Sequence, residues 1–139
     1  MSDPFDLARF LQAQEPVWLH VLDELGRGRK QSHWMWFVFP QIKGLGHSAM
    51  AERYAIRSRA EAGAYLAHPV LATRLRQATV LVNAVEGRTT DDIFGYPDDL
   101  KFRSSMTLFD AVEPDGVFAR ALEKYFGGKP DQATITLLS

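Results

Sequence analysis

The sequence predicts an all-α protein that forms a single compact multi-helix domain. Helix-capping residues recur along the chain, and the apolar residues that follow them are spaced three and four apart, as on one face of a helix. No hairpin dipeptide lies between segments of alternating polarity, a pattern typical of β-hairpins. At 139 residues the chain has the length of one domain, which we assign to residues 1–139.

Composition argues against several classes of function. Apolar residues make up 46% of the chain, and the formal net charge of −1 provides no broad positive field for duplex nucleic acid or an anionic membrane. The chain has no cysteine, which excludes a disulfide framework and thiolate chemistry. Its first residues are acidic, unlike a signal peptide, and no apolar run is long enough to cross a membrane. We therefore expect a cytoplasmic protein that binds neither duplex nucleic acid nor membrane.

Two helices and a short apolar run are expected in the first 40 residues. Asp3 and Pro4 predict the first helix start, because aspartate caps free N–H groups and proline fits the first helical position. A second helix begins at Pro16, and we expect its outer face to carry His20, Asp23 and Glu24. The apolar run Trp34–Phe39 fits a buried strand or a short buried helix. Because no other segment offers a strand partner, we predict a helix capped by Ser32 and stopped by Pro40.

The remaining helices are predicted from their first residues. Ser48 and Ser58 each precede a helical apolar pattern, and Ser58 with Glu61 has the spacing of a capping box. Pro69 opens the longest predicted helix, which runs through Val85. Four further capping residues predict a short turn and three more helices, and these are Thr89, Asp98, Asp115 and Asp131.

The predicted helix from Asp98 to Val112 carries polar residues within its apolar arc. A rotation of about 100° per residue places Lys101 beside Leu108, and Ser104 and Ser105 fall in the same arc. A buried ammonium needs a partner. The alternative is that Lys101 extends from the edge of the arc into water, while the serines bond to the preceding turn.

Two other polar residues also face a predicted core. Arg74 lies in the middle of the apolar face of the Pro69 helix, either as a structural ion-pair partner or as part of an anion site. His33 lies beside Trp36 and Phe37 on the helical wheel, so we expect it to be at least half buried. A lone buried histidine is more often a core residue than a catalyst.

These inward polar residues, none of them acidic, would form a cationic pocket if they gathered in one place. Such a pocket, rich in hydrogen-bond donors, suits phosphate or carboxylate. If the pocket is catalytic, His33 is the candidate general base, and Ser104 or Ser105 the nucleophile or orienting hydroxyl. Arg74 and Lys101 would then stabilise developing negative charge.

Two helix starts and several aromatic residues are expected to add ligand contacts. Backbone N–H groups at a helix start favour anions. A basic arm, formed by Arg27, Arg29 and Lys30, precedes one predicted helix, and a glycine loop, residues 43–48, leads into the next. The glycines of the loop fit a C-cap and a turn equally well, and they lack Walker spacing. The tryptophans could stack on a base, although at helical spacing they are more often core residues. The predicted ligand-binding residues are Arg29, Lys30, Ser32, Trp34, Trp36, Gly44, Gly46, Ser48 and Arg74.

The sequence predicts neither a metal site nor a cofactor. The histidines are scattered, no two of them lie at ligand spacing on one predicted helix, and the His-Glu-x-x-His motif is absent. The chain also lacks the elbow motif that would anchor a hydrolase triad.

Several long strings in the sequence resemble those of a known bacterial family. They are Gly28–Gln41, Gly44–Gly46, Ala64–Leu71 with Arg74–Leu75, Ile93–Gly95 with Asp98, Lys101, Ser104–Phe109 and Lys124–Phe126. Over almost its whole length the chain resembles domain of unknown function 1810 (DUF1810). The resemblance implies a compact, all-helical, soluble protein, and an association with proteins that process ADP-ribose or other NAD-derived nucleotides. Some members carry the label calpastatin, but nothing in this chain resembles a disordered protease inhibitor.

Three functions are compatible with these patterns. The first is a pocket for a phosphate-bearing small molecule, such as an ADP-ribose-like nucleotide, which is either hydrolysed or only bound. The second is a non-enzymatic regulatory or protein-interaction module, in which the same polar residues form structural pairs. The third is single-stranded RNA binding through the basic arm and the tryptophans, which requires an exposed aromatic platform.

Overall fold

Helices make up the fold, which confirms the predicted all-α class. The computed structural model describes residues 2–139. The first elements are α1 (Ala8–Gln14), the 3-10 turn η1 (Glu15–Val17), α2 (Trp18–Gly26), α3 (Met35–Val38), α4 (Ala49–Arg53) and α5 (Arg59–Ala67). They are followed by α6 (Pro69–Ala84), α7 (Thr90–Phe94), α8 (Asp98–Val112), α9 (Val117–Phe126) and α10 (Gln132–Leu138). Over residues 2–139 the only β pairing is an isolated parallel bridge between Ile42 and Ile56.

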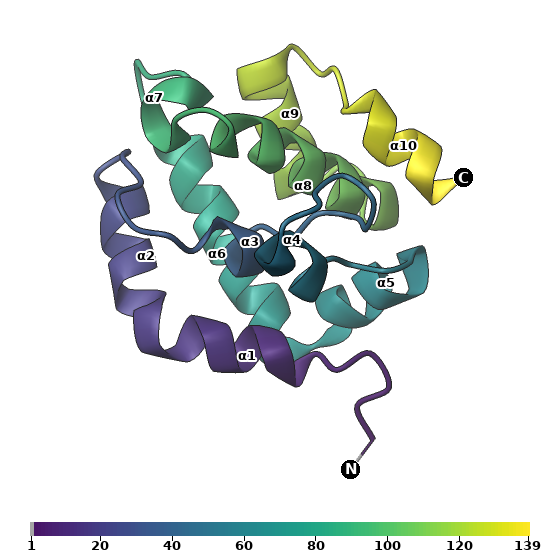
Figure 1. Cartoon of the computed structure of the whole chain (residues 1–139). Coiled ribbons are helices and arrows are strands. Elements are labelled where there is room, and N and C mark those ends of the chain that lie inside the picture. The colour runs from purple at the N-terminus through teal and green to yellow at the C-terminus, as the bar shows by residue number, and fades with distance from the viewer. Residues whose placement is uncertain (1) are drawn as a thin grey trace.

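The two longest helices form the framework of the molecule. Helix α6 packs against α2, α5 and α9, while α8 packs against α5, α7, α9 and α10 (Figure 1). The segment that carries α3 and α4 lies across the front of α6 in this view. Aromatic rings fill the space where α3, α7 and α8 meet, since the ring centroid of Phe102 lies 5.1 Å from that of Phe39 and 4.8 Å from that of Phe94. These contacts bring the beginning of α8 next to α3.

Half of the predicted side-chain caps are confirmed. Ser48 accepts a hydrogen bond from the backbone N–H of Ala51, Ser58 from that of Glu61 and Asp131 from that of Thr134. Thr89 forms a reciprocal capping box with Asp92. Pro69 occupies the first turn of α6 as predicted, and the preceding His68 side chain caps that helix. Local sequence therefore determines these helix starts.

Other predicted helix starts are wrong. Ser32 does not cap the apolar helix, which begins only at Met35. Asp98 lies inside α8 and not before it, and its side chain pairs with lysines instead. Asp115 has a positive φ of 66°, and α9 starts at Val117 without a side-chain cap. Asp3 does accept bonds from two backbone N–H groups, but the α-helix itself begins at Ala8.

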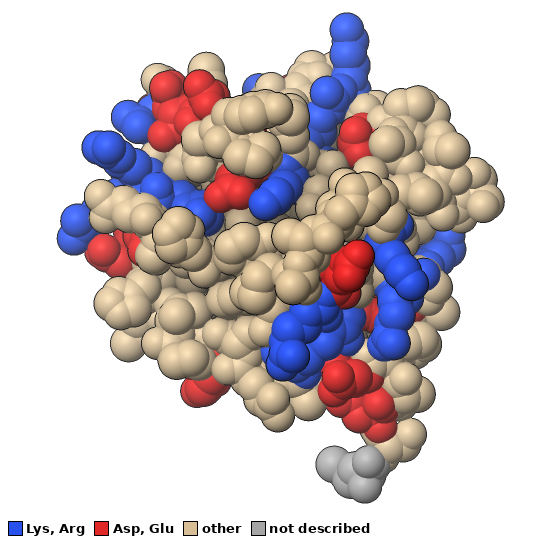
Figure 2. Space-filling view, in the orientation of Figure 1, with Lys and Arg blue, Asp and Glu red and all other residues tan. Residues whose placement is uncertain are grey.

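Charges of opposite sign are mixed on the surface. On the face shown in Figure 2, basic side chains lie beside acidic ones, in accord with the net charge of −1. Within residues 2–139, no helix is both long and apolar enough to cross a membrane.

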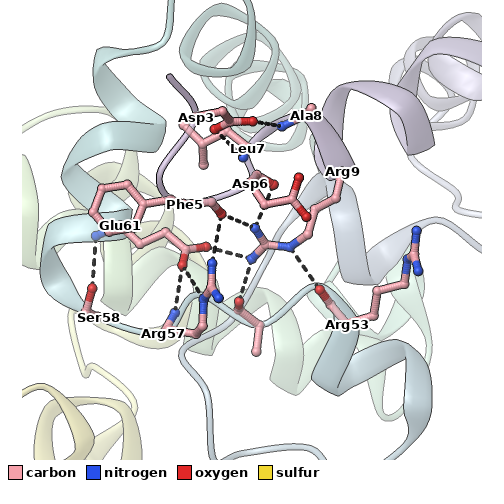
Figure 3. Close-up of polar contacts among 11 residues, drawn as sticks. Asp3, Phe5, Asp6, Leu7, Ala8, Arg9, Arg53, Arg57, Ser58 and Glu61 are labelled. Atoms are coloured by element: carbon pink, nitrogen blue, oxygen red, sulfur yellow. Dashed lines mark hydrogen bonds and ion pairs between the residues drawn. The ribbon is translucent and has the colours of Figure 1, made fainter. Parts of the chain in front are cut away.

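A buried ion pair joins α1 to α5. The Arg9 guanidinium lies 2.6 Å from Glu61 Oε2, and these side chains are 8% and 0% exposed. Arg9 also donates to four backbone carbonyls, while the second Glu61 oxygen accepts from Arg57 (Figure 3). Both buried charges are thus compensated, which holds the N-terminal segment, the end of α4 and the start of α5 together.

Removal of one partner of this pair should destabilise the protein. Glu61→Gln leaves the Arg9 guanidinium buried without its counter-charge, and we expect a loss of about 3 kcal/mol in the free energy of unfolding. The matched control is Glu52→Gln in α4, where the side chain is exposed and a change within about 0.5 kcal/mol is expected. Urea unfolding measures both variants. Equal stability of the two variants would contradict the assignment.

Candidate functional site

The chain that follows α2 is held by a buried carboxylate. Glu24 is 7% exposed, and its Oε1 accepts hydrogen bonds from the backbone N–H groups of Gln31 and Ser32 and from the Trp34 indole. Its Oε2 accepts from the Ser32 hydroxyl. The sequence prediction placed Glu24 on an outer face, which is wrong because the following segment folds back over that face of α2.

The hydrogen bonds keep Glu24 ionised. Burial alone would raise the pKa of its carboxyl, but hydrogen bonds from Ser32, Gln31 and Trp34 outweigh burial and lower the pKa from 4.5 to about 2. When the pKa of a carboxyl is lower in the folded state than in the unfolded state, the carboxyl stabilises the fold. This stabilisation is complete at a pH above the pKa of the unfolded state. That contribution is lost as the pH falls from 4.5 towards 2.

Glu24→Gln should remove this pH-dependent contribution. At neutral pH the free energy of unfolding of the variant should be about 3 kcal/mol lower than that of the native protein, because each pKa unit corresponds to about 1.4 kcal/mol. The difference should shrink as the pH approaches 2. Urea unfolding across this range measures it, with Asp23→Asn as the exposed neighbouring control. A stability difference that does not vary with pH would refute the assigned role.

The anchored segment brings two lysines to one aspartate. The Lys30 ammonium lies 2.9 Å from Asp98 Oδ2 and 5.2 Å from the ring centroid of Trp34. The Lys101 ammonium lies 3.5 Å from Asp98 Oδ1 and 5.2 Å from the ring centroid of Trp36. Each lysine thus has a carboxylate and an aromatic face as neighbours. The partner that Lys101 required is Asp98, so the expectation of a cluster without an acid is wrong.

A groove of about 370 Å³ opens beside Lys101. Its polar lining comes from Gln41, His47, Ser48, Lys101, Ser104 and Asp131, and its apolar lining from Leu45, Gly46, Ala51, Pro97 and Leu100. A smaller cavity of about 20 Å³ shares Gln41, Gly46 and Ala51 with the groove and reaches Trp36 and Gly44. The groove therefore lies where the glycine loop, the start of α8 and the start of α10 meet.

Close packing fixes the glycine loop of the groove. Gly44 has a φ of +108°, and Leu137 of α10 would lie 3.3 Å from a β-carbon added there. A β-carbon at Gly46 would come within 2.6 Å of that of Ala51. Glycine is thus required at these two positions by backbone conformation and by close approach, respectively.

Gly46→Ala should test the tight packing of this loop. The added methyl group overlaps Ala51, so we expect a loss of about 1–3 kcal/mol in the free energy of unfolding. Gly63→Ala is the matched control, since Gly63 lies inside α5 with nothing within 4 Å of the added carbon. That control should gain about 0.5–1 kcal/mol. Thermal unfolding measures both, and a gain in both variants would disprove the close contact.

Several predicted site residues lie together at the groove. Gly46, Ser48, Lys101 and Ser104 line it directly, while Trp36 and Gly44 line the adjoining small cavity. Lys30 shares Asp98 with Lys101. The Ser48 hydroxyl accepts a capping bond, and the Ser104 hydroxyl lies 3.0 Å from Asp131 Oδ2.

Other predicted site residues do not reach the groove. His33 is exposed, not half buried as expected. Ser105 is fully buried, and its hydroxyl has no hydrogen-bond partner within residues 2–139. Arg74 lies 2.8 Å from Glu15 and stacks on Trp18, so its contacts are those of the structural ion pair that we considered.

The predicted site residues between α2 and α3 differ in what they contact. Arg29 is exposed and does not line the groove. Ser32 and Trp34 donate to Glu24, and Trp34 is only 1% exposed. A ring so deeply buried cannot stack on a base, which removes Trp34 from the aromatic platform that RNA binding would require.

Sequence reasoning missed several lining residues of the groove. Gln41 and Asp131 come from segments that only the fold brings to the groove, whereas His47 lies between the predicted residues Gly46 and Ser48. Asp98 was within reach of sequence reasoning, because a position three residues before Lys101 lies on the same side of a helix.

Within residues 2–139, no group of three or more His, Cys, Asp or Glu side chains could hold a metal ion. The groove thus offers one ammonium, one carboxylate and several other hydrogen-bonding groups.

Comparisons with known proteins identify relatives over nearly the whole length. The model of the family described as "Protein of unknown function (DUF1810)" matches residues 4–138. The chain is also similar to the crystal structure of the conserved hypothetical protein Rv1873 from Mycobacterium tuberculosis. The two are 55% identical, with a TM-score of 0.93 and 98% of each chain covered. Among curated proteins, none matches this chain.

Proposed function

Because the chain belongs to the DUF1810 family, whose description assigns no activity, we propose from its groove that it binds a phosphate-bearing small molecule. The ligand class is a nucleotide of the ADP-ribose or NAD-derived kind, as the family resemblance also implies. The observation that carries this proposal is the partly exposed Lys101 ammonium at a groove of about 370 Å³. That volume is within the range of sites for small molecules.

The ion-pair distances favour Lys101 as the cation that meets the phosphate. Asp98 lies closer to Lys30, at 2.9 Å, than to Lys101, at 3.5 Å. The Lys30 side chain is 7% exposed, whereas that of Lys101 is 25% exposed. Lys30 is thus the nearer and more deeply buried partner of Asp98. Lys101, the more exposed of the two, is the one that an incoming anion can reach.

The rest of the lining suits the uncharged part of such a ligand. Leu45, Pro97 and Leu100 provide an apolar wall for the face of a base. Gln41 and His47 provide further hydrogen-bonding groups at the same groove. This combination of a few polar groups with an apolar wall is typical of small-molecule sites.

Lys101→Met should abolish most of the affinity for phosphate-bearing ligands. Methionine keeps an unbranched chain against Trp36 but removes the ammonium, so binding of ADP-ribose should weaken at least about tenfold. Asp98→Asn should strengthen binding, because it removes the carboxylate that competes for Lys101. Calorimetry with ADP-ribose, AMP and inorganic phosphate measures these effects.

The exposed Lys129→Met is the matched control for loss of one positive charge. It should leave the affinity within about twofold of the native value, since screened surface charges contribute little. Melting temperatures separate the proposal from a non-enzymatic interaction module with purely structural pairs. A marked fall in the melting temperature of Lys101→Met, with no heat from any of the compounds, would favour that alternative.

A further inference from the structure

The groove contains a carboxylate with only one of its two oxygens engaged. Asp131 Oδ2 lies 3.0 Å from the Ser104 hydroxyl, and it accepts hydrogen bonds from the backbone N–H and the hydroxyl of Thr134. Within residues 2–139, no donor is hydrogen-bonded to Oδ1, although Asp131 lines the groove. One oxygen therefore holds the start of α10, and the other has no hydrogen-bond partner within these residues.

This carboxylate is linked through Ser104 to the face of α8 that carries Lys101. Ser104 and Lys101 are three residues apart on α8, so their side chains are neighbours on one face, with β-carbons about 5–6 Å apart. Asp131 is in hydrogen-bonding contact with Ser104. A bare anion at Lys101 would thus lie near a like charge. A ligand that carries a hydrogen-bond donor beside its anionic group would satisfy both side chains.

The other polar side chains of the groove bear on which ligand donor fits best. A ligand ammonium could donate to Asp131 and to the oxygens of Gln41 and Ser48, but it could not accept from the Gln41 amide N–H or the Ser48 hydroxyl. Hydroxyl groups both donate and accept, so a ligand with several of them can bond to the carboxylate and also satisfy these donors. The apolar residues of the same lining suit the carbon face of a sugar ring.

We infer that Asp131 recognises a ligand hydroxyl group, so that the groove selects hydroxyl-bearing phosphates, such as sugar phosphates and ribonucleotides, over bare phosphate. This inference rests on the proposed function, because it assumes that Lys101 meets the phosphate. It adds a specificity-determining residue that lies on the C-terminal segment, outside the sequence motifs that predicted the site. It also ties ligand recognition to α10, because the same carboxylate caps that helix.

Asp131→Asn tests the inference, with ribose 5-phosphate and inorganic phosphate as probes in calorimetry. Asparagine keeps one oxygen for Ser104 and Thr134 but replaces the free carboxylate oxygen with an amide donor. Affinity for ribose 5-phosphate should fall at least about tenfold, because a charge-assisted hydrogen bond is lost. Affinity for inorganic phosphate should stay the same or rise, because a like charge is removed.

Thr134→Val controls for loosening of α10. It removes a hydroxyl that donates to the structural oxygen and leaves the free oxygen in place, so the affinity for ribose 5-phosphate should stay within about twofold. Circular dichroism and melting temperatures establish that both variants fold. If Thr134→Val weakens binding as much as Asp131→Asn, the effect belongs to α10 and the inference fails.

The same titrations distinguish failure of the inference from failure of the proposed function. If the native protein binds both probes equally, and Lys101→Met loses both, the phosphate site stands and the role of Asp131 is wrong. If phosphoethanolamine binds more tightly than ribose 5-phosphate, the groove recognises an amine and not a hydroxyl group, which also overturns the inference. If the native protein binds none of these probes, both proposals fail.

Discussion

The hydrogen bonds to the Glu24 carboxylate are the constraint on which the candidate site depends. They hold residues 31–34 against α2 and so set the position from which α3 begins. Lys30 precedes this anchored segment and reaches Asp98, and Trp36 follows it and lies beneath Lys101. One buried acid in the second helix thereby positions groups from α3 and α8 beside each other. Because its carboxylate is ionised and accepts four hydrogen bonds, this part of the framework is held in place by contacts that involve no ligand.

Sequence patterns predicted the helical class and about half of the helix starts, because caps such as Ser48, Ser58 and Thr89 act over three or four residues. They failed where a distant segment supplies the partner. Glu24 belongs to the polar face of its helix on a wheel, and it is buried only because the chain returns over it. Asp98 does not cap α8, since two lysines compete successfully for its carboxylate. A helical wheel predicts the direction in which a side chain points, but it does not predict which other segment of the chain packs over that side chain.

Sequence patterns also predicted some residues of the candidate site and missed others. Lys101 and Ser104 were found from their unusual place in an apolar arc, and both line the groove. Arg74 was found in the same way, yet its contacts are Glu15 and Trp18, so an inward polar residue can be explained by an ion pair alone. Asp131 has no unusual feature in the sequence beyond its cap position, and only the packing of α10 on α8 brings it to the groove. The site that we propose combines one cation with one carboxylate, in place of the purely cationic pocket predicted from the sequence.

Titration of isotope-labelled protein with ADP-ribose, followed by backbone amide NMR, tests the central claim most directly. The account predicts saturable shift changes at Gly46, His47, Lys101 and Ser104, which line one groove from two separate segments. It predicts no comparable changes at Arg74 and Glu15, which form an ion pair that does not line the groove. Saturable changes confined to the Arg74 region, or no saturable change at the groove, would contradict the account.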